Sequence, residues 1–282
     1  MSASPVRTTS LPGGAAMPVL GLGTWRMGEK KGGAGAEADA LRLGLDLGMG
    51  LIDTAEMYGE GGAEQVVGDA IAGRRDAVFL VSKLYPQNAT RAGTLEACER
   101  SLKRLRTDRI DLYLLHWRGG ARLPVVVEAF GRLVEAGKIR HWGVSNFDQS
   151  DMAELVTLPG GKSVAANQVL YNLKRRGIEF DLMPWCRTHK IPMMAYSPVD
   201  QGGLVAHPVL AAIGKRHGAT PAQIAIAWLL RQPGVIVIPK ASSPQHVREN
   251  RAAADVALTA ADLQEIDKAF PPPRGAAPLE ML

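Results

Sequence analysis

Eight short apolar runs recur along the chain at nearly regular spacing, and this pattern restricts the fold more than any other feature of the sequence. The runs are Val19–Gly23, Leu51–Asp53, Val78–Val81, Ile110–Leu115, Ile139–Val144, Val164–Val169, Ile191–Tyr196 and Val235–Ile238. Their centres lie roughly 25 to 33 residues apart until a longer last gap. Stretches with apolar residues at helical spacing separate them, as at Leu95, Cys98, Leu102 and Leu105. Strands therefore alternate with helices.

Runs that are apolar on both faces, each followed by an amphipathic helix, are typical of a buried parallel sheet covered by helices. Eight such units in 282 residues fit a closed (β/α)8 TIM barrel better than an open doubly wound sheet, which usually has fewer strands. An open dinucleotide-binding sheet would also carry Gly-x-Gly-x-x-Gly after its first strand, and the segment Gly21–Arg26 lacks the third glycine. We therefore predict an α/β fold of the (β/α)8 barrel class.

Two segments are predicted to be additions to the barrel. Leu11–Val19 is expected to form an N-terminal β-hairpin around two glycines and to cap the bottom of the barrel. Thr259 begins an extra C-terminal helix with a start that resembles a capping box, and this helix ends before Pro271. A short tail to Leu282 follows. The sequence has no linker long enough to divide it, so residues 1–282 are predicted to form a single domain.

Composition narrows the class of partner. Lys and Arg together number 33 against 28 Asp and Glu, a net charge of +5 that favours anionic ligands. Aromatic residues make up only 5% and the basic residues are scattered, which argues against nucleic acid as a partner. The two cysteines, Cys98 and Cys186, lie far apart, so neither a disulfide scaffold nor a cysteine-rich metal site is expected. Met1–Gly14 lacks the apolar run of a secretory signal, and no stretch approaches about 18 apolar residues, so we expect a cytoplasmic protein without membrane contact.

Active sites of parallel barrels lie on the loops that leave the carboxyl ends of the strands. Four polar residues occupy or closely follow such positions, namely Asp53, Tyr58, Lys83 and His116. Each alone has an ordinary structural explanation: a helix cap for the Asp, packing for the Tyr, a solvated Lys, and a hydrogen-bonded core His. Their combination points to acid–base chemistry instead.

Proton donation by a tyrosine at neutral pH needs a nearby cation, because the pKa of a free phenol is about 10. Lys83 is expected to supply that cation and to favour the phenolate of Tyr58. Asp53 would keep the lysine charged and oriented, and His116 would donate a hydrogen bond to the oxygen on which negative charge develops. Such a device delivers a proton to a carbonyl oxygen without a nucleophile or a metal. It indicates reduction of a carbonyl by an external hydride.

Eight motifs extend this pattern over nearly the whole chain: Gly21–Trp25, Ile52–Gly59, Ser82-Lys83, Leu114–Trp117, Gly143–Phe147, Asn167-Gln168, Tyr196–Pro198 and Ile238–Lys240. In these motifs and their order the chain resembles the aldo-keto reductases, in particular bacterial, broad-specificity members with a short carboxyl tail. The resemblance implies NAD(P)H-dependent reduction of aldehydes and ketones by a catalytic tetrad of Asp53, Tyr58, Lys83 and His116. In that tetrad Tyr58 is the general acid in reduction and the general base in the reverse oxidation.

The resemblance also implies a cofactor site. Ser145, Asn146 and Gln168 would hold the nicotinamide carboxamide, and the ring of Tyr196 would stack on the nicotinamide. The full set of implied cofactor-binding residues is Gly23, Thr24, Trp25, Asp53, Ser145, Asn146, Gln168, Tyr196, Ser197, Pro198, Gln201, Gly203, Leu204, Ile238, Lys240, Ser242, Ser243, His246, Glu249 and Asn250. The substrate is expected to contact Trp25, Tyr58, His116 and Trp117, although core packing explains the two tryptophans equally well.

Two segments are candidates for binding the cofactor phosphates. The loop Gln201–Leu204 has two glycines whose backbone N–H groups would approach a pyrophosphate, and an ordinary flexible loop is the alternative. Lys240 and Ser242-Ser243 precede a helix, a position suited to the adenosine phosphate. Many family members have an arginine six residues after this lysine, whereas this chain has His246, and Arg248 would point elsewhere on the helix. NADPH is therefore expected, with weaker discrimination against NADH.

The short tail suggests an open site with loose selectivity for aldehydes, including 2-oxoaldehydes such as methylglyoxal. Lys174–Arg176 follows the sixth strand and is expected to be a solvated loop in preference to a binding site for acidic substrates. Two other functions stay open. One is an aldolase-type barrel in which Lys83 or Lys240 forms a Schiff base, and the other is a nucleotide-sensing subunit with little turnover. The oligomeric state is open, with a monomer favoured.

Overall fold

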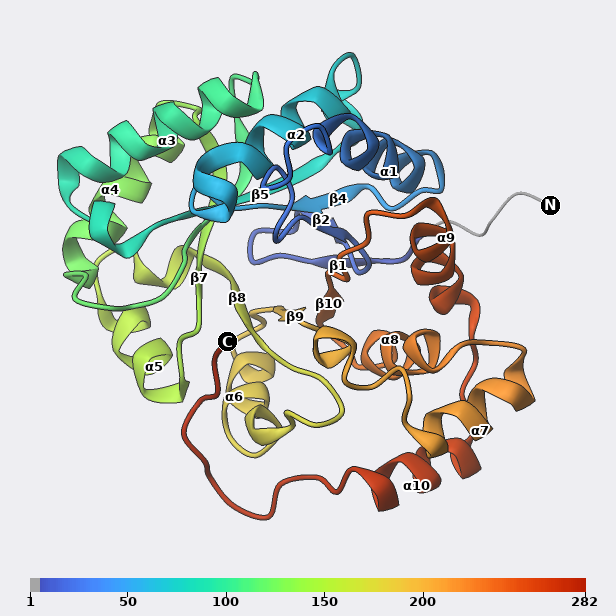
Figure 1. Ribbon diagram of the computed structural model, residues 1–282. Coiled ribbons are helices and arrows are strands. Elements are labelled where there is room, and N and C mark those ends of the chain that lie inside the picture. Colours follow the sequence, from blue (N-terminus) through green and yellow to red (C-terminus); the bar gives the residue numbers. More distant parts are fainter. Residues whose placement is uncertain (1–5) are drawn as a thin grey trace.

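The computed structural model describes residues 6–282, and it confirms the predicted barrel (Figure 1). Eight strands form one parallel sheet: β3 (Leu22–Gly23), β4 (Leu51–Asp53), β5 (Phe79–Leu84), β6 (Ile110–Leu115), β7 (Ile139–Ser145), β8 (Val164–Leu170), β9 (Met193–Tyr196) and β10 (Val235–Val237). Parallel bridges Leu20–Val237 and Gly23–Lys240 join its two edges, so the sheet closes on itself. Residues 1–5 lie outside the described residues. They include the start of the predicted domain and of the segment Met1–Gly14, which is predicted to lack a secretory signal.

Helices form a ring outside the strands (Figure 1). They are α1 (Ala34–Asp46), α2 (Gly62–Ile71), α3 (Arg91–Leu105), α4 (Leu123–Glu135), α5 (Gln149–Thr157), α6 (Leu182–Thr188), α7 (Pro208–His217), α8 (Pro221–Leu230), α9 (Pro244–Ala252) and α10 (Ala260–Ala269). The longer gap before the last strand holds two helices, α7 and α8. The predicted extra C-terminal helix is α10, and Thr259 caps it in a capping box with Asp262.

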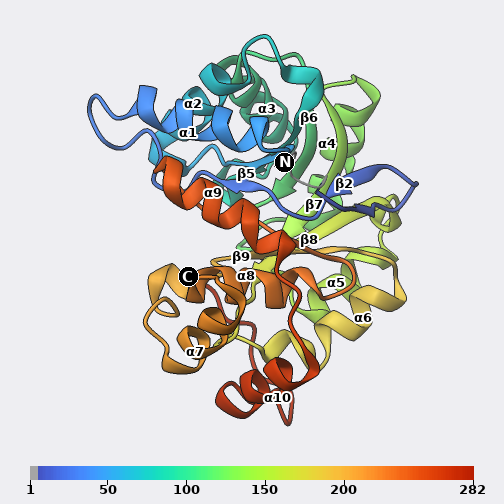
Figure 2. The ribbon, with the colours of Figure 1, turned by 90° about the vertical axis from the view of Figure 1, so that its right-hand side faces the viewer.

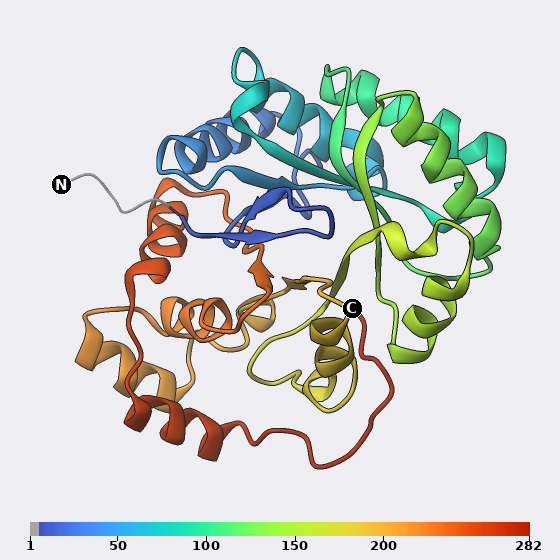
Figure 3. The same cartoon turned by 180° about the vertical axis from the view of Figure 1, so that it is seen from behind.

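The predicted N-terminal hairpin is present and begins earlier than expected. Its strands β1 (Thr8–Ser10) and β2 (Ala16–Pro18) are antiparallel. Gly13 in the turn has a φ of 93°, a conformation that glycine adopts readily. Leu11 and Met17 pack into the interior cluster of the barrel together with Leu51, the first residue of β4. The hairpin therefore closes the amino end of the barrel, as Figure 3 shows from behind.

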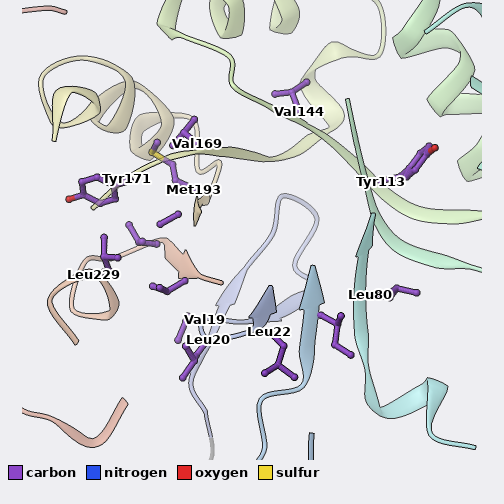
Figure 4. Packing of buried hydrophobic residues seen from close by; sticks show 14 of the residues in the cluster. Val19, Leu20, Leu22, Leu80, Tyr113, Val144, Val169, Tyr171, Met193 and Leu229 are labelled. Carbon is purple, nitrogen blue, oxygen red and sulfur yellow. The ribbon is translucent and has the colours of Figure 1, made fainter. Parts of the chain in front are cut away.

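Side chains along each strand alternate between the barrel interior and the helix-covered outside. On β5, Leu80 belongs to the core beneath the helices, whereas Val81 belongs to the cluster inside the barrel. Figure 4 shows part of the outer core, including Leu80, Tyr113 and Leu229. The same alternation turns Lys83, two residues after Val81, into the barrel. The interior is thus apolar near the hairpin and polar toward the carboxyl ends of the strands.

The carboxyl tail crosses that polar end of the barrel. From Pro271 it passes α6 and ends near the barrel centre, on the side opposite the hairpin (Figures 1 and 2). Arg175 and Glu280 form an ion pair at 2.5 Å, and the backbone N–H of Leu282 lies 3.4 Å from the Tyr196 hydroxyl. The expectation that a short tail leaves the site open is therefore wrong at this edge. No helix in residues 6–282 has the length and apolar character needed to span a membrane.

Candidate active site

The four predicted catalytic side chains converge at the carboxyl ends of β4, β5 and β6. Lys83 is fully buried, and its ammonium uses all three of its protons. It donates to Asp53 Oδ2 at 2.8 Å, to the Thr54 carbonyl at 2.9 Å and to the Tyr58 hydroxyl at 3.3 Å. Burial lowers the pKa of Lys83, but Asp53 and Tyr58 raise it, and the net direction is upward. Lys83 is therefore a fixed cation.

Tyr58 begins a short 3₁₀ turn, η1 (Tyr58–Gly61), in the loop that follows β4, the strand that ends with Asp53. The Lys83 Nζ lies 4.8 Å from the centre of the Tyr58 ring. Burial raises the pKa of Tyr58 above its usual value, while the charge and the hydrogen bond of Lys83 lower it. The predicted effect of Lys83 is present, but burial outweighs it in this structure. The phenol is thus protonated at neutral pH and ready to donate.

His116 follows β6 and faces Tyr58 edge to face, with ring centres 5.6 Å apart. Burial and the charge of Lys83 hold the pKa of His116 well below its ordinary range, so the imidazole is neutral. Within residues 6–282 its buried Nδ1 has no hydrogen-bond partner. A buried Nδ1 without a partner costs less free energy as an unprotonated acceptor than as an N–H donor, so we assign the imidazole proton to Nε2. His116 is therefore neutral, and this state is compatible with the predicted role as a hydrogen-bond donor.

Gln168 binds Asp53, a contact that the sequence does not predict. Its Nε2 donates to Asp53 Oδ1 at 2.8 Å, so the two oxygens of that carboxylate bind Lys83 and Gln168 respectively. Gln168 lies on β8 and is buried. The glutamine expected to hold a carboxamide therefore also orients the carboxylate of the tetrad.

Asn146 connects the other residues predicted to surround the nicotinamide. It follows Ser145 at the end of β7 and has a φ of 57°, in the left-handed region. Its Nδ2 donates to the His116 carbonyl at 3.1 Å and to Ser145 Oγ at 3.2 Å, and its Oδ1 accepts from the Tyr196 hydroxyl at 3.0 Å. Burial raises the pKa of Tyr196 to about 12, so this hydroxyl keeps its proton. These residues form a polar surface beside Tyr58.

The end of β3 lies next to the predicted phosphate site. A Cβ on Gly23 would lie 2.8 Å from the Ile238 carbonyl, so this position requires glycine. Thr24 is buried, and its hydroxyl donates to the Asp53 carbonyl at 2.9 Å. Trp25 is 41% exposed, so the core-packing alternative is wrong for this residue. Trp117 is only partly buried and lies 5.2 Å from the His116 ring, ring centre to ring centre.

The loop after β9 has an unusual backbone. Ser197, Asp200 and Gln201 all have φ between 52° and 54°, which is uncommon for residues other than glycine. Lys174 binds this loop by donating to Asp200 Oδ2 at 3.1 Å and to the Gly203 carbonyl at 2.9 Å. Pro198 and Leu204 are buried, so Leu204 has only its main chain to offer a ligand.

The prediction that Lys174–Arg176 is a solvated loop holds for Lys174, which is exposed, and is wrong for Arg176, which is buried. Lys174 binds the loop after β9, and Arg175 binds Glu280 of the tail. Arg176 is 9% exposed and donates to Glu179 and to the Phe270 carbonyl. The three cations therefore link loops to one another, while the side chains of Lys174 and Arg175 remain 39% and 41% exposed.

The predicted adenosine-phosphate residues lie together at the start of α9. Lys240 Nζ donates to Ser242 Oγ at 3.2 Å. Ser243 caps the helix by accepting from the His246 backbone N–H at 3.3 Å. His246 and Arg248 are both exposed. Asn250 is buried, and the Glu249 carbonyl accepts from Gln223 Nε2 at 3.1 Å. This hydrogen bond therefore also holds α9 against α8.

Comparison with known proteins decides what kind of barrel this is. The model of the aldo/keto reductase family matches residues 19–270. The chain belongs to the aldo/keto reductase family. Methylglyoxal reductase YeaE of Escherichia coli is 50% identical over 275 residues, 96% of this chain and 97% of that protein. Glyoxal reductase of Bacillus subtilis is 34% identical over 264 residues, 92% and 91% of the two chains.

Solved structures agree with this assignment. An aldo/keto reductase from Klebsiella pneumoniae in complex with NADP and acetate superposes with a TM-score of 0.96 at 49% identity, covering 98% of this chain and all of that one. A second structure from that organism, in complex with NADPH, has the same TM-score and identity and covers 99% of this chain.

Two features of this aldo/keto reductase bear on the Schiff-base alternative. A lysine nucleophile needs a lowered pKa, whereas the pKa of Lys83 is raised. Lys240 is exposed, and the desolvation that activates such an amine is missing. Residues 6–282 also contain no cluster of His, Cys, Asp or Glu suited to a metal.

The sequence did not predict that the main-chain carbonyls of Thr54 and His116 accept hydrogen bonds from Lys83 and Asn146, because any residue type supplies such an acceptor.

Proposed function

We propose that this aldo/keto reductase reduces aldehydes and ketones to alcohols with NADPH and that Tyr58 donates the proton. The observation that carries the proposal is the buried Lys83 ammonium, bonded at once to the Asp53 carboxylate at 2.8 Å and to the Tyr58 hydroxyl at 3.3 Å. This arrangement favours negative charge on the phenol oxygen as its proton leaves.

Each tetrad residue has a distinct part in the reaction. When bound, the nicotinamide supplies the hydride that reaches the carbonyl carbon. Tyr58 gives its proton to the carbonyl oxygen, and Nε2–H of neutral His116 donates a hydrogen bond to the same oxygen as charge develops there. Asp53 keeps Lys83 charged, and Lys83 offsets the effect of burial on Tyr58. In the reverse oxidation Tyr58 accepts the proton.

The polar surface around Asn146 fits a nicotinamide. Ser145, Asn146 and Gln168 offer amide and hydroxyl groups to a carboxamide, and the half-buried ring of Tyr196 offers a face for stacking. Tyr196 donates to Asn146, which fixes the ring relative to the carboxamide site. In this proposal the residues at the ends of β7 to β9 would hold the nicotinamide beside Tyr58.

The proposed preference for NADPH depends on the start of α9. Lys240, Ser242 and the capped helix amino end suit a 2′-phosphate. His246 is exposed where many family members have an arginine, and a single imidazole offers no planar fork for phosphate oxygens. We therefore expect NADPH to bind more tightly than NADH by a modest factor.

The proposed substrates are small aldehydes, including 2-oxoaldehydes. Two relatives are named for methylglyoxal and glyoxal, which supports this choice. Trp25 and Met57 are 41% and 40% exposed beside the tetrad, so apolar aldehydes also have a surface to contact. We further propose that residues 1–282 are one domain, active as a monomer in the cytoplasm; the two free cysteines, both buried, are consistent with a reducing compartment.

A panel of substrates tests the proposed function. The purified protein is assayed for oxidation of NADPH and of NADH with methylglyoxal, benzaldehyde and simple ketones. We expect turnover with the aldehydes and higher kcat/KM with NADPH. NADPH binding without turnover on any carbonyl would support the nucleotide-sensing alternative instead. Borohydride-trapped substrate on Lys83 would support the aldolase alternative.

A further inference from the structure

Two buried carboxylates flank Tyr58 in the sequence, and both bind the segment around Lys83. Glu64, in the first turn of α2, has a side chain that is 0% exposed, and its Oε1 accepts from Ser82 Oγ at 2.6 Å. Glu56, two residues before Tyr58, is 8% exposed in its side chain, and its Oε1 accepts from the Tyr85 backbone N–H at 2.7 Å. Ser82 and Tyr85 stand on either side of Lys83. The segment that bears the acid is therefore attached at both ends to the segment that bears the cation.

Both carboxylates also bind groups around α3. Glu64 Oε2 accepts from Arg104 Nε at 2.6 Å. Glu56 Oε1 accepts from Asn88 Nδ2 at 3.0 Å, and its Oε2 lies 3.8 Å from the Arg100 guanidinium. A buried carboxylate persists when a cation and hydrogen bonds compensate its lost hydration. These partners meet that condition, so the two carboxylates act as firmly held anchors.

The backbone between Tyr58 and Glu64 needs such anchors. Gly59, Glu60 and Gly61 have φ values of 55°, 53° and 91°, all in the left-handed region. A residue other than glycine pays about 1 kcal/mol or more for this conformation, so Glu60 adds strain to this turn. A Cβ on Gly61 would lie 2.5 Å from Arg104 Cδ, which shows how closely this turn packs on the arginine that binds Glu64.

We propose that Glu56 and Glu64 are positioning residues that fix the 3.3 Å distance between the Tyr58 hydroxyl and the Lys83 ammonium and thereby govern proton donation. Two hydrogen bonds, to Asp53 and to the Thr54 carbonyl, immobilise Lys83 independently of Tyr58, so the variable partner is Tyr58. The attraction between the ammonium and a developing phenolate falls as the two atoms separate. A small displacement of the phenol also spoils its approach to the carbonyl oxygen. This inference rests on the proposed function.

Ser82→Ala tests the proposal with the smallest change. It removes the bond from Glu64 to the Lys83 strand and leaves the Arg104 bond in place. We expect kcat for aldehyde reduction to fall roughly 10-fold, since a 1 Å displacement costs up to about 100-fold. A weaker influence of Lys83 raises the pKa of Tyr58, so the alkaline limb of the kcat pH profile should move to higher pH. The NADPH dissociation constant, measured by fluorescence titration, should not change.

Ser101→Ala is the matched control. Ser101 is also fully buried, and its Oγ accepts from Arg104 at 3.4 Å, but it lies on α3 away from Lys83. We expect this variant to keep the kcat and pH profile of the unmodified enzyme even where its Tm falls. Glu56→Gln tests the other anchor, because it removes the charge while an amide oxygen can still accept from Tyr85. It should move the pH limb in the same direction as Ser82→Ala.

The outcomes distinguish failure of the positioning proposal from failure of the proposed function. If Ser82→Ala and Ser101→Ala both lower Tm and leave kcat and the pH profile unchanged, the carboxylates are only structural and the positioning proposal fails. If the unmodified protein shows no NADPH-dependent reduction of any aldehyde, the proposed function itself fails.

Discussion

The Asp53–Lys83 pair gives the sharpest prediction about the tetrad. Its atoms are 2.8 Å apart, and the side chains of Lys83 and Asp53 are 0% and 4% exposed. With an effective dielectric constant of about 20, two unit charges at this distance attract each other by about 6 kcal/mol. The desolvation penalty for one buried ion is several kcal/mol, so this attraction is what keeps Lys83 protonated. Asp53→Asn removes it with little change in size.

In Asp53→Asn, burial acts on Lys83 without the opposing carboxylate, so the lysine pKa falls instead of rising. A neutral Lys83 no longer offsets the effect of burial on Tyr58. The loss of the Asp53 charge acts in the opposite direction but is the smaller of the two causes, so the pKa of the phenol rises further. We expect kcat for aldehyde reduction at neutral pH to fall about 100-fold. Lys83 regains its proton as the pH is lowered, so part of the loss should be recovered in mildly acidic buffer.

The assay is the steady-state rate of NADPH oxidation with a saturating aldehyde, followed from about pH 5.5 to 9 for both proteins. The NADPH dissociation constant and Tm serve as controls for binding and folding. A loss of less than about threefold, or a loss of equal size at every pH, would refute the reasoning that Asp53 acts through the charge of Lys83.

Three further predictions address other parts of the molecule. His246→Arg should tighten NADPH relative to NADH about tenfold, because a guanidinium binds phosphate through two parallel bonds; an unchanged ratio of dissociation constants would remove His246 from the phosphate site. Removal of Leu279–Leu282 takes the tail away from Tyr196 and should raise kcat/KM for bulky aldehydes more than for methylglyoxal; equal changes for both would contradict this. Burial alone would raise the pKa of Asp262, but hydrogen bonds from Arg216, Thr259 and His217 lower it, so its stabilisation is present above about pH 4 and is lost as the pH falls. Asp262→Asn should therefore cost about 1–2 kcal/mol of unfolding free energy at pH 7 and progressively less in acid, measured by urea unfolding.

The barrel was predictable because each of its units repeats one physical pattern. A run such as Ile110–Leu115 is buried on both faces, and only a sheet covered by helices explains that. Strand ends were less certain: β5 extends to Leu84, three residues past the predicted Val81, because the alternation that buries Lys83 has no apolar signature. Short helices such as α6, with 7 residues, carry too few turns for a clear period.

The sequence allowed candidate residues of the site to be chosen from their residue type and position. It did not predict the hydrogen bonds that connect them. Asp53, Tyr58, Lys83 and His116 were found because ionisable residues at strand ends are rare enough to notice. The bond from Gln168 to Asp53 joins residues 115 positions apart, and only the closed barrel brings them together. The path of the tail over Tyr196 was missed for a similar reason, since it depends on the pairing of Arg175 with Glu280.

Tyr58→Phe in a single-turnover experiment is the most direct test of the central claim that Tyr58 is the proton donor. The variant keeps the ring that faces His116 and Lys83 and removes only the hydroxyl. With enzyme in excess over NADPH and a saturating aldehyde, we expect the rate of hydride transfer to fall about 1,000-fold or more, with an NADPH dissociation constant within about twofold of the unmodified enzyme. A rate within about tenfold of the unmodified enzyme, with NADPH still bound, would show that the proton comes from elsewhere and would contradict the account.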